Sequence, residues 1–286
     1  MSYATDAAFR AALETRLASR SRDAGIDLGR LRRRVVFERV LARLEQGDPG
    51  RWILKGGMAL EVRWQDRARA TRDLDLAVRH DIETGDDVRG ALAKPLSADP
   101  SHDRFRFTVG EARNLQADEA GRPGWKVAVD CGLAGRQFAA VRIDVVVRPD
   151  EITRTERIRF PSSLVFAGIE PSEVEVVDRA QHFAEKLHAL TRTYGTRPNT
   201  RTRDLADLVL LIDDGLEPSK PLLDATDHVF ATRATHPLPA ELPDPPTDWA
   251  PRYADLAVDL DVSAETMNDA MTLIRAFWRD VLSHQE

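Results

Sequence analysis

Cysteine is nearly absent from this sequence, since Cys131 is the only one among 286 residues. A single thiol excludes an intrachain disulfide and a cysteine-rich metal site, and it fits a reducing compartment. Long apolar runs are absent as well. Charged residues interrupt the first 22 residues every few positions, and no later stretch approaches the roughly 20 apolar residues of a membrane-spanning helix. We therefore expect a cytoplasmic protein that has no membrane partner.

A strong positive charge is also missing, because the formal net charge is −6. The charge is unevenly placed. Residues 1–80 hold 17 Lys and Arg against 11 Asp and Glu, whereas residues 204–286 hold 5 against 17. An acidic total argues against a protein that coats nucleic acid without specificity, but it permits a local basic surface.

The spacing of apolar residues predicts an α+β protein. Residues 31–45 have the spacing of an amphipathic helix, and residues 71–78 alternate polar and apolar, which is typical of a strand. Further strands are predicted at 51–55, 103–110, 124–133 and 138–148, the last two as a hairpin. Further helices are predicted at 178–194, 202–213 and 263–283, with Ser263 as the N-cap of the last. We expect a mixed sheet with helices in residues 1–170 and a mostly helical domain in residues 171–286.

The strand at 71–78 carries the acidic pair Asp73 and Asp75. Side chains two residues apart in a strand lie on the same face, so the two carboxylates are close together. They repel each other unless a cation lies between them, and oxygen ligands of this kind suit Mg²⁺. An exposed strand face with two solvated acids is the alternative, and the pair alone does not exclude it.

A third acid, Asp144, lies between Ile143 and Val145 in an otherwise apolar strand. An isolated carboxylate among apolar side chains is costly unless it is paired or binds a metal. Two acids on one strand and one on a neighbour make a two-metal site possible, with metal-assisted chemistry at a phosphate. Asp130 is a rival for the third position, and the sequence leaves that choice open.

Gly56 and Gly57 follow the predicted strand at 51–55 and open a predicted helix. Glycines at this place expose backbone N–H groups, and the helix N-terminus adds a favourable dipole for the β- and γ-phosphates of a nucleotide. The Gly-Lys-Ser/Thr signature of a phosphate-binding loop is absent. A simple turn is the alternative.

Together these segments resemble the nucleotidyltransferase superfamily of DNA polymerase β. More narrowly, the sequence is similar to the AbiEii/MenT-like toxin nucleotidyltransferases of bacterial toxin–antitoxin systems. The matching segments are Lys55-Gly56-Gly57, RATRDLD at 69–75, Asp144, AEKLHALT at 184–191, TRDLADL at 202–208 and residues 235–257. The fifteen residues between Gly57 and Asp73 are more than the superfamily pattern usually has. The resemblance implies a polymerase β-like core followed by a helical domain that contributes to the active site.

The resemblance also assigns residues of the second half. Lys186 would contact the triphosphate, and Asp207 would hold Lys186 or another basic group in position. A surface lysine and a solvated acid are the alternatives, and Asp204 could equally cap its helix. The predicted catalytic residues are Asp73, Asp75, Asp144, Lys186 and Asp207, of which the first three would be metal ligands. The predicted nucleotide-binding residues are Lys55, Gly56, Gly57, Arg69, Thr71, Arg72 and Asp204.

The function that the resemblance implies is that of a toxin. It would transfer a nucleoside monophosphate from an NTP to RNA, at the 3′ end of tRNA, with two Mg²⁺ ions as cofactor and pyrophosphate as leaving group. Aminoacylation and growth would stop. CTP or another pyrimidine nucleotide is one option for the substrate. Nucleotidylation of a protein side chain and a non-catalytic nucleotide- or RNA-binding module are the alternatives.

The helix at 29–40 offers a basic surface for the RNA backbone, with a solvated helix face as the alternative. The arginines concerned are Arg30, Arg32, Arg33, Arg34 and Arg39.

Thr71 lies two residues before Asp73 and so on the face of the acids. Phosphorylation there would place about two negative charges beside the metal site. This suggests an antitoxin that is a kinase. A hydrogen bond from Thr71 to the glycine loop is the alternative. The NTP, the acceptor, the antitoxin and the oligomeric state are left open.

Overall fold

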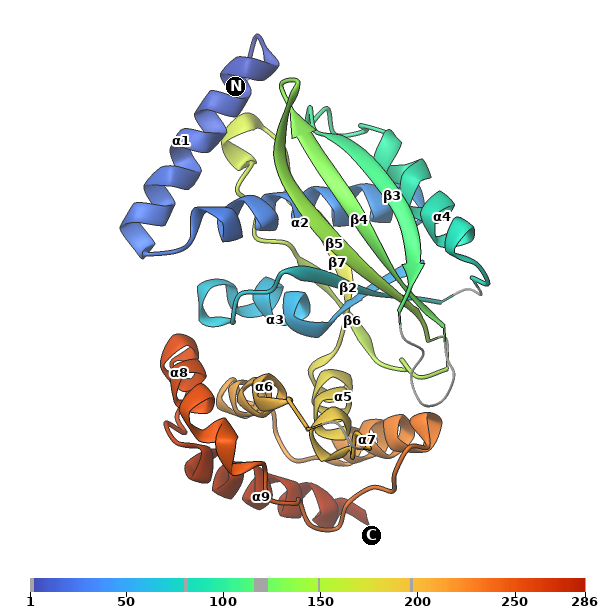
Figure 1. Cartoon of the computed structure of the whole chain (residues 1–286), viewed down its shortest axis with the longest axis vertical. Coiled ribbons are helices and arrows are strands. Elements are labelled where there is room, and N and C mark those ends of the chain that lie inside the picture. The colour runs from blue at the N-terminus through green and yellow to red at the C-terminus, as the bar shows by residue number, and fades with distance from the viewer. Residues whose placement is uncertain (1–2, 80–81, 116–122, 149, 196–197, 286) are drawn as a thin grey trace. The chain divides into compact units, whose positions relative to one another are not determined.

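The structure, a computed structural model, describes residues 3–79, 82–115, 123–148, 150–195 and 198–285 (Figure 1). The chain forms two compact units. The first comprises residues 1–65, 70–149 and 156–176, and the second comprises residues 66–69, 150–155 and 177–286. Two short segments that precede the expected boundary at residue 170 thus belong to the second unit.

A mixed sheet forms the centre of the first unit, with the strand order β3-β4-β5-β2-β1-β7-β6 among the described residues. The strands are β1 (Trp52–Lys55), β2 (Asp73–Val78), β3 (Arg106–Asn114), β4 (Gly124–Leu133), β5 (Arg136–Val147), β6 (Thr155–Arg159) and β7 (Glu173–Val177). β4 and β5 pair antiparallel and form the predicted hairpin. β2 lies between β5, to which it is parallel, and β1, to which it is antiparallel. This arrangement places the segments around residues 55, 75 and 144 next to one another.

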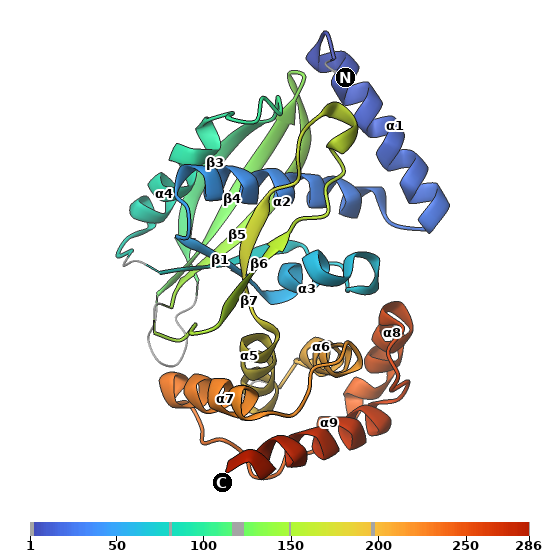
Figure 2. The same ribbon diagram turned by 180° about the vertical axis from the view of Figure 1, so that it is seen from behind.

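Helices cover the sheet and complete the core of the first unit. They are α1 (Asp6–Ala24), α2 (Leu28–Gly47), α3 (Gly56–Trp64) and α4 (Gly85–Ser97). Figure 2 shows α2 crossing one face of the strands. Buried residues of α2, such as Leu31 and Val40, share one apolar core with Phe9 of α1 and Ile143 of β5. Each such side chain contributes roughly 1.5–3 kcal/mol on burial, so the core holds the strands that carry the acids.

The helix α2 differs from the predicted amphipathic helix. It is buried without interruption from Val35 to Leu44, and that stretch includes Glu38, Arg39 and Arg43. Buried charges require partners. Arg43 donates to the carboxylate of Asp103, which is itself buried. The charges in this helix therefore form ion pairs inside the protein, and the apolar spacing alone could not reveal that.

The second unit is helical, as predicted. Its helices are α5 (Arg179–Thr191), α6 (Thr202–Asp213), α7 (Lys220–Arg233), α8 (Ala250–Leu260) and α9 (Met267–Leu282). Asp178 caps α5 by accepting a hydrogen bond from the backbone N–H of Gln181 at 2.7 Å. The helix α8 was not predicted, since it begins inside a stretch rich in proline and aspartate, with Pro251 in its first turn, where proline is tolerated.

The predicted cap of the last helix is wrong. α9 begins after Thr266, whose side chain accepts from the backbone N–H of Asp269. Ser263 instead donates from its backbone N–H and its hydroxyl to the carboxylate of Asp213. Both Ser263 and Thr266 have side chains that can cap a helix. The distant carboxylate of Asp213 binds Ser263, so Thr266 is the residue that caps α9.

The fold class is the predicted one, a mixed sheet with helices followed by a helical part. Among the described residues, no helix combines the length and the apolar character needed to cross a membrane.

Candidate active site

Strand register brings two of the predicted metal ligands together. Asp75 of β2 and Asp144 of β5 are direct neighbours in the parallel ladder, and Asp73 is the neighbour of Arg142. Residues paired in this way project to the same face, as do residues two apart in one strand. The three carboxylates therefore share one face across two adjacent strands.

Asp144 is the best candidate for the third acid. Its Oδ1 is buried without a hydrogen-bond partner, and its Oδ2 lies 3.4 Å from Nζ of Lys126. Burial raises the pKa of the Asp144 carboxyl; Lys126 lowers it and Asp73 raises it further. The rival Asp130 is exposed, pairs in register with Ala140 and accepts a hydrogen bond from Gln137. The register therefore favours Asp144 over Asp130.

The first glycine of the pair has a steric reason to be glycine. Gly56 has a φ of +63°, and a Cβ atom added to it would lie 2.0 Å from Oδ2 of Asp75. No other residue fits there without moving the carboxylate. Gly56 thus opens α3 directly beside Asp75, and the helix N-terminus and an acidic side chain meet at one place. Gly57 is buried in the first turn of the same helix.

Two basic side chains lie among the acids. Nε of Arg142 donates to Oδ1 of Asp73 at 2.7 Å, and Lys126 of β4 is the register neighbour of Asp144. As they stand, no three Asp, Glu, His or Cys side chains of the described residues are close enough together to hold a metal ion. The chemistry of the three aspartates nevertheless fits a metal ion. Three carboxylates share a face, one oxygen is buried without a partner, and a divalent cation prefers such oxygen ligands.

The remaining predicted residues of the first unit lie nearby in the chain but differ in exposure. Lys55 pairs in register with Asp75 and precedes α3. Arg72 is exposed. Thr71 is only 8% exposed, and its hydroxyl donates to the backbone carbonyl of Asp73 at 3.1 Å. The hydroxyl therefore binds the start of β2, and not the glycine loop that the sequence offered as an alternative.

The second unit contains a separate charged cluster built by α5, α6 and the segment 66–69. Nζ of Lys186 lies 2.6 Å from Asp204 and 2.8 Å from Asp207. Arg69 donates to both oxygens of Asp207, at 2.9 Å from one nitrogen and 3.0 Å from another. Arg201 pairs with Asp204 at 3.6 Å. The predicted partnership of Lys186 with Asp207 is present, and Asp204 belongs to the same cluster and does not cap α6.

This cluster is buried, and its charges stabilise one another. Burial alone would raise the pKa of Asp207, but Lys186 and Arg69 hold that pKa well below its usual range. Burial alone would lower the pKa of Lys186, but Asp204 and Asp207 raise it above its usual value. The lysine is thus a fixed cation with a defined position, since both carboxylates restrain it.

The basic surface expected on the helix at 29–40 is not formed as predicted. Arg39 is 1% exposed and paired with Glu38, so it is not available to RNA. The other four arginines are each paired with a carboxylate of the protein. Arg30 and Arg34 pair with Glu61, Arg32 with Glu14 and Arg33 with Asp27. Because Arg30 and Arg34 share Glu61, three carboxylates face these four arginines and reduce the positive charge of the helix without cancelling it. RNA binding by these four arginines stays a prediction.

Arg142 and Lys126 are the functional candidates that sequence reasoning missed. Arg142 stands two residues before Asp144, in the same strand and on the same face, which was a readable signal. Lys126 lies 18 residues from Asp144 in the chain, and only the hairpin register makes them neighbours.

The family follows from a comparison over most of the chain. The family model described as "Nucleotidyl transferase AbiEii toxin, Type IV TA system" matches residues 39–279. The chain belongs to the AbiEii nucleotidyltransferase toxin family. The resemblance read from the motifs is thereby confirmed, and an AbiEii protein of a type IV toxin–antitoxin system has an antitoxin as its partner. No curated protein matches the chain.

The solved structure of MenT4 has the same fold as this AbiEii protein. MenT4, a nucleotidyltransferase toxin from Mycobacterium tuberculosis H37Rv, is 19% identical with a TM-score of 0.52, covering 96% of this chain and 99% of that one. An antigenic nucleotidyltransferase-like protein from Paracoccidioides brasiliensis is 17% identical with a TM-score of 0.42, covering 80% and 92%. At an identity of 19%, the likeness to MenT4 concerns the fold alone.

Proposed function

We propose that this AbiEii protein is a Mg²⁺-dependent enzyme that transfers a nucleoside monophosphate from an NTP to RNA. The acceptor is the 3′ end of tRNA, and pyrophosphate is released. Modification of that end blocks aminoacylation and translation. The observation that carries the proposal is the juxtaposition of Gly56, Asp75 and Asp144 on one face of the sheet, with Oδ1 of Asp144 buried and without a partner.

In this proposal Asp73, Asp75 and Asp144 hold the metal. Bound Mg²⁺ supplies charge neutralisation at the triphosphate and lowers the pKa of the attacking hydroxyl. The carboxylates share one face, so they orient the nucleotide from one side. The N-terminus of α3 at Gly56 offers backbone N–H groups to its phosphates. Lys55, the last residue of β1, directly precedes Gly56 and is the cation closest in sequence to this helix N-terminus.

Lys186 and Asp207 are proposed to serve the same reaction. In the second unit, Asp207 orients both Lys186 and Arg69, which supports a positioning role for the carboxylate. A restrained ammonium is suited to bind phosphate as a point charge. Their part in catalysis stays a prediction that variants of each residue test.

Control by a kinase antitoxin at Thr71 also stays a prediction. Thr71 is buried and hydrogen-bonded to the start of β2, so a kinase could reach its hydroxyl only after this segment has moved. A phosphate there would add negative charge beside Asp73 and repel the triphosphate. Phosphorylated protein that retains full transfer activity and normal NTP affinity would contradict this route.

The experiment uses purified full-length protein with Mg²⁺, total tRNA and each of the four α-³²P-labelled NTPs in turn. Asp73→Ala and Asp144→Asn are the site variants. Asp130→Asn is the matched control, because Asp130 is an exposed acid of the same sheet whose side chain bonds Gln137. We expect label on tRNA from one or two nucleotides, lost in both site variants and kept in the control.

Each other result changes the conclusion in a defined way. Label on protein alone would make a side chain the acceptor. Equal loss of label in Asp130→Asn and Asp144→Asn would contradict the choice of the third carboxylate. No label with any NTP, from folded wild-type protein, would overturn the transferase and leave a nucleotide- or RNA-binding module.

A further inference from the structure

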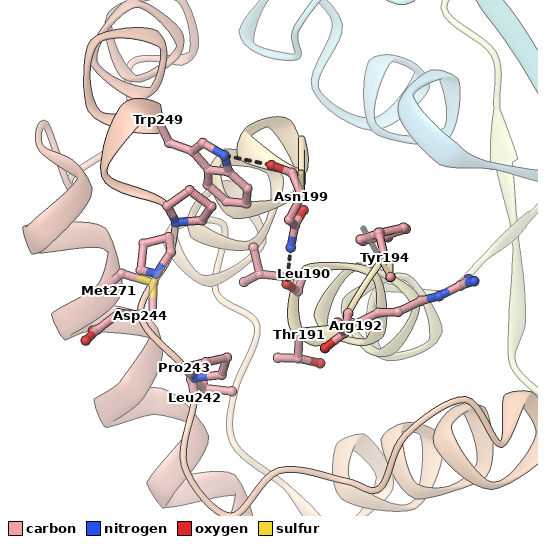
Figure 3. Close-up of a pocket in the computed structure, with 14 residues that line it drawn as sticks. Leu190, Thr191, Arg192, Tyr194, Asn199, Leu242, Pro243, Asp244, Trp249 and Met271 are labelled. Atoms are coloured by element: carbon pink, nitrogen blue, oxygen red, sulfur yellow. Dashed lines mark hydrogen bonds between the residues drawn. The ribbon is translucent and has the colours of Figure 1, made fainter. Parts of the chain in front are cut away.

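The second unit contains a cavity of about 250 Å³ (Figure 3), whose lining does not include Lys186, Asp204 or Asp207. One wall is the end of α5 with the connection that follows it, and the opposite wall is the segment 242–246 with Trp249 and Met271. Asn199 links the walls. Its side-chain amide donates to the backbone carbonyl of Leu190 at 2.9 Å. Its backbone carbonyl accepts from the indole N–H of Trp249 at 3.0 Å. The cavity therefore has a hydrogen-bonded frame.

The lining of the cavity combines apolar side chains with polar ones such as Thr191 and Thr193, and one wall is stiff. Trp249 and Met271 are each 4% exposed, and three prolines of the segment 242–246 restrict the backbone of one wall. The volume is smaller than the roughly 300–1,000 Å³ of sites for drug-sized ligands. A single flat ring system, such as one nucleobase, is the kind of group that such a space accommodates.

One arginine, Arg192, lies on the rim of the cavity, and Asp244 on the opposite side is paired with Arg275. The connection at 191–203 contains four arginines and no acid, although residues 204–286 hold 17 acids against 5 basic residues. The guanidinium carbons of Arg192 and Arg201 lie 5.1 and 5.3 Å from the ring centre of Tyr194. Nε of Arg201 also donates to the hydroxyl of Tyr194 at 2.8 Å. Arg197 lies outside the described residues.

We infer that this cavity binds one nucleotide of the RNA acceptor, with the base between the walls and a neighbouring phosphate at Arg192. The inference rests on the proposed function. Arginines beside an aromatic ring and an apolar slot are what single-stranded RNA requires, since its phosphates need cations and its unstacked bases need flat apolar contacts. Arg192 favours RNA over an apolar protein segment, because such a segment carries no phosphate for the guanidinium to bind.

The test measures RNA binding by the full-length protein in an Asp73→Ala background, so that the RNA is not altered during the measurement. The probe is a fluorescein-labelled, unstructured 12-nucleotide RNA, followed by anisotropy over a series of KCl concentrations. The variants are Arg192→Gln, Tyr194→Ala and Met271→Trp, the last of which fills the cavity. The matched control is Arg252→Gln, an exposed arginine of α8 outside the cavity. Circular dichroism melts confirm that each variant is folded.

We expect Tyr194→Ala and Met271→Trp to weaken RNA binding roughly 5- to 100-fold, the range for loss of one stacked base. Arg192→Gln should weaken binding and reduce the slope of log K against log salt by about one. The control should bind as the parent does. If Met271→Trp fails to fold, the two variants at the rim decide the matter.

Unchanged RNA affinity in the folded variants, or an equal loss in Arg252→Gln, would overturn the inference and leave a protein segment as the occupant. Failure of the proposed function is distinguishable. In that case wild-type protein transfers no label to tRNA, whereas the selective loss of RNA binding in the cavity variants would still establish the RNA site.

Discussion

The α-carbon of Gly56 lies against the carboxylate of Asp75, so closely that an added Cβ atom would stand 2.0 Å from Oδ2. The start of α3 and the second acid of β2 are therefore one structural unit. Any side chain at residue 56 must displace the carboxylate or the helix. This contact is the physical reason for a glycine ahead of an Asp-x-Asp pair.

Gly56→Ala is expected to lower both stability and activity. Alanine at a positive φ costs about 1–2 kcal/mol, and the clash with Asp75 adds to this. Gly50→Ala is the matched control, since Gly50 has a φ of +73° with nothing within 4 Å of the added Cβ. Urea unfolding should show the backbone cost in both variants. If Asp75 is the metal ligand we propose, the proposed transfer to tRNA should fall about 100-fold only in Gly56→Ala, because that variant displaces its carboxylate. Full activity of Gly56→Ala would contradict the role of Asp75.

Arg142→Gln and Lys126→Gln are expected to tighten divalent metal binding. Arg142 and Lys126 pair with Asp73 and Asp144, and both compete with an ion for the carboxylates. Exposed ion pairs contribute about 0–1 kcal/mol, so the dissociation constant for Mn²⁺ should fall up to about fivefold. Titration by electron paramagnetic resonance measures it without reference to activity.

The control for the metal titration is Arg106→Gln, an exposed arginine of β3. Weaker Mn²⁺ binding in Arg142→Gln or Lys126→Gln would show that these cations do not compete with the ion. No Mn²⁺ binding by the wild type, even at millimolar concentration, would contradict the metal site itself.

Asp207→Asn is expected to destabilise the second unit by roughly 3–5 kcal/mol, because it leaves Lys186 and Arg69 buried with too little negative charge. Asp224→Asn is the matched control. It breaks the exposed pair of Lys220 with Asp224, also formed at 2.9 Å, and should cost less than about 1 kcal/mol. Chemical unfolding at pH 7 measures both. Equal losses of unfolding free energy in the two variants would show that the buried cluster stabilises the protein no more than the exposed pair does.

The stabilisation by Asp207 should also depend on pH in one direction. The pKa of Asp207 in the folded protein is held below its unfolded value by Lys186 and Arg69. Its contribution is therefore fully present above the ordinary Asp pKa of about 3.9 and is lost as the pH falls below that value. The difference in unfolding free energy between wild type and Asp207→Asn should shrink between about pH 4 and pH 2.

His188 is expected to make the protein less stable in mild acid. Burial and the neighbouring Arg233 and His236 lower the pKa of His188 to about 3, against a smaller raising effect of Glu151. Nδ1 of His188 accepts from Arg233 at 3.3 Å, which requires a neutral ring. Because the unfolded imidazole titrates near pH 6.5, its stability contribution is complete above that pH and declines as the pH falls towards 3. The loss at pH 5 should be about 2 kcal/mol.

The pH dependence of unfolding in urea, between pH 7 and pH 5, tests this. His188→Leu should be less stable than wild type at pH 7 but should show a smaller loss on acidification. His102→Asn is the control, because His102 is exposed and has a φ of +50° that asparagine tolerates. If the unfolding free energy of His188→Leu falls between pH 7 and pH 5 as much as that of the wild type, a group other than His188 causes the acid sensitivity.

Much of the fold follows from local patterns. The alternation at 71–78 and the apolar spacing of residues 178–191 predicted β2 and α5, since backbone geometry alone sets those periods. The helix α8 was not predicted because the residues before it are rich in proline and aspartate, which is typical of a loop. Arg39 of α2 was assigned to the surface for a related reason. A charged residue signals solvent unless its partner is known, and the partners of Arg39 and Arg43 include Asp103, about 60 positions away.

The residue types of the candidate site can be read from the sequence alone. It placed Asp73 and Asp75 on one face, because that relationship depends only on neighbours within a strand. It put a glycine pair at a helix start, and its motifs indicated the family. Only the tertiary structure decided that Asp144 and not Asp130 adjoins Asp75, that Arg142 and Lys126 lie among the acids, and that Arg69 joins Asp207. These relationships depend on strand order, register and helix packing. They are set by the burial of a shared core far from the residues concerned, and no local pattern encodes them.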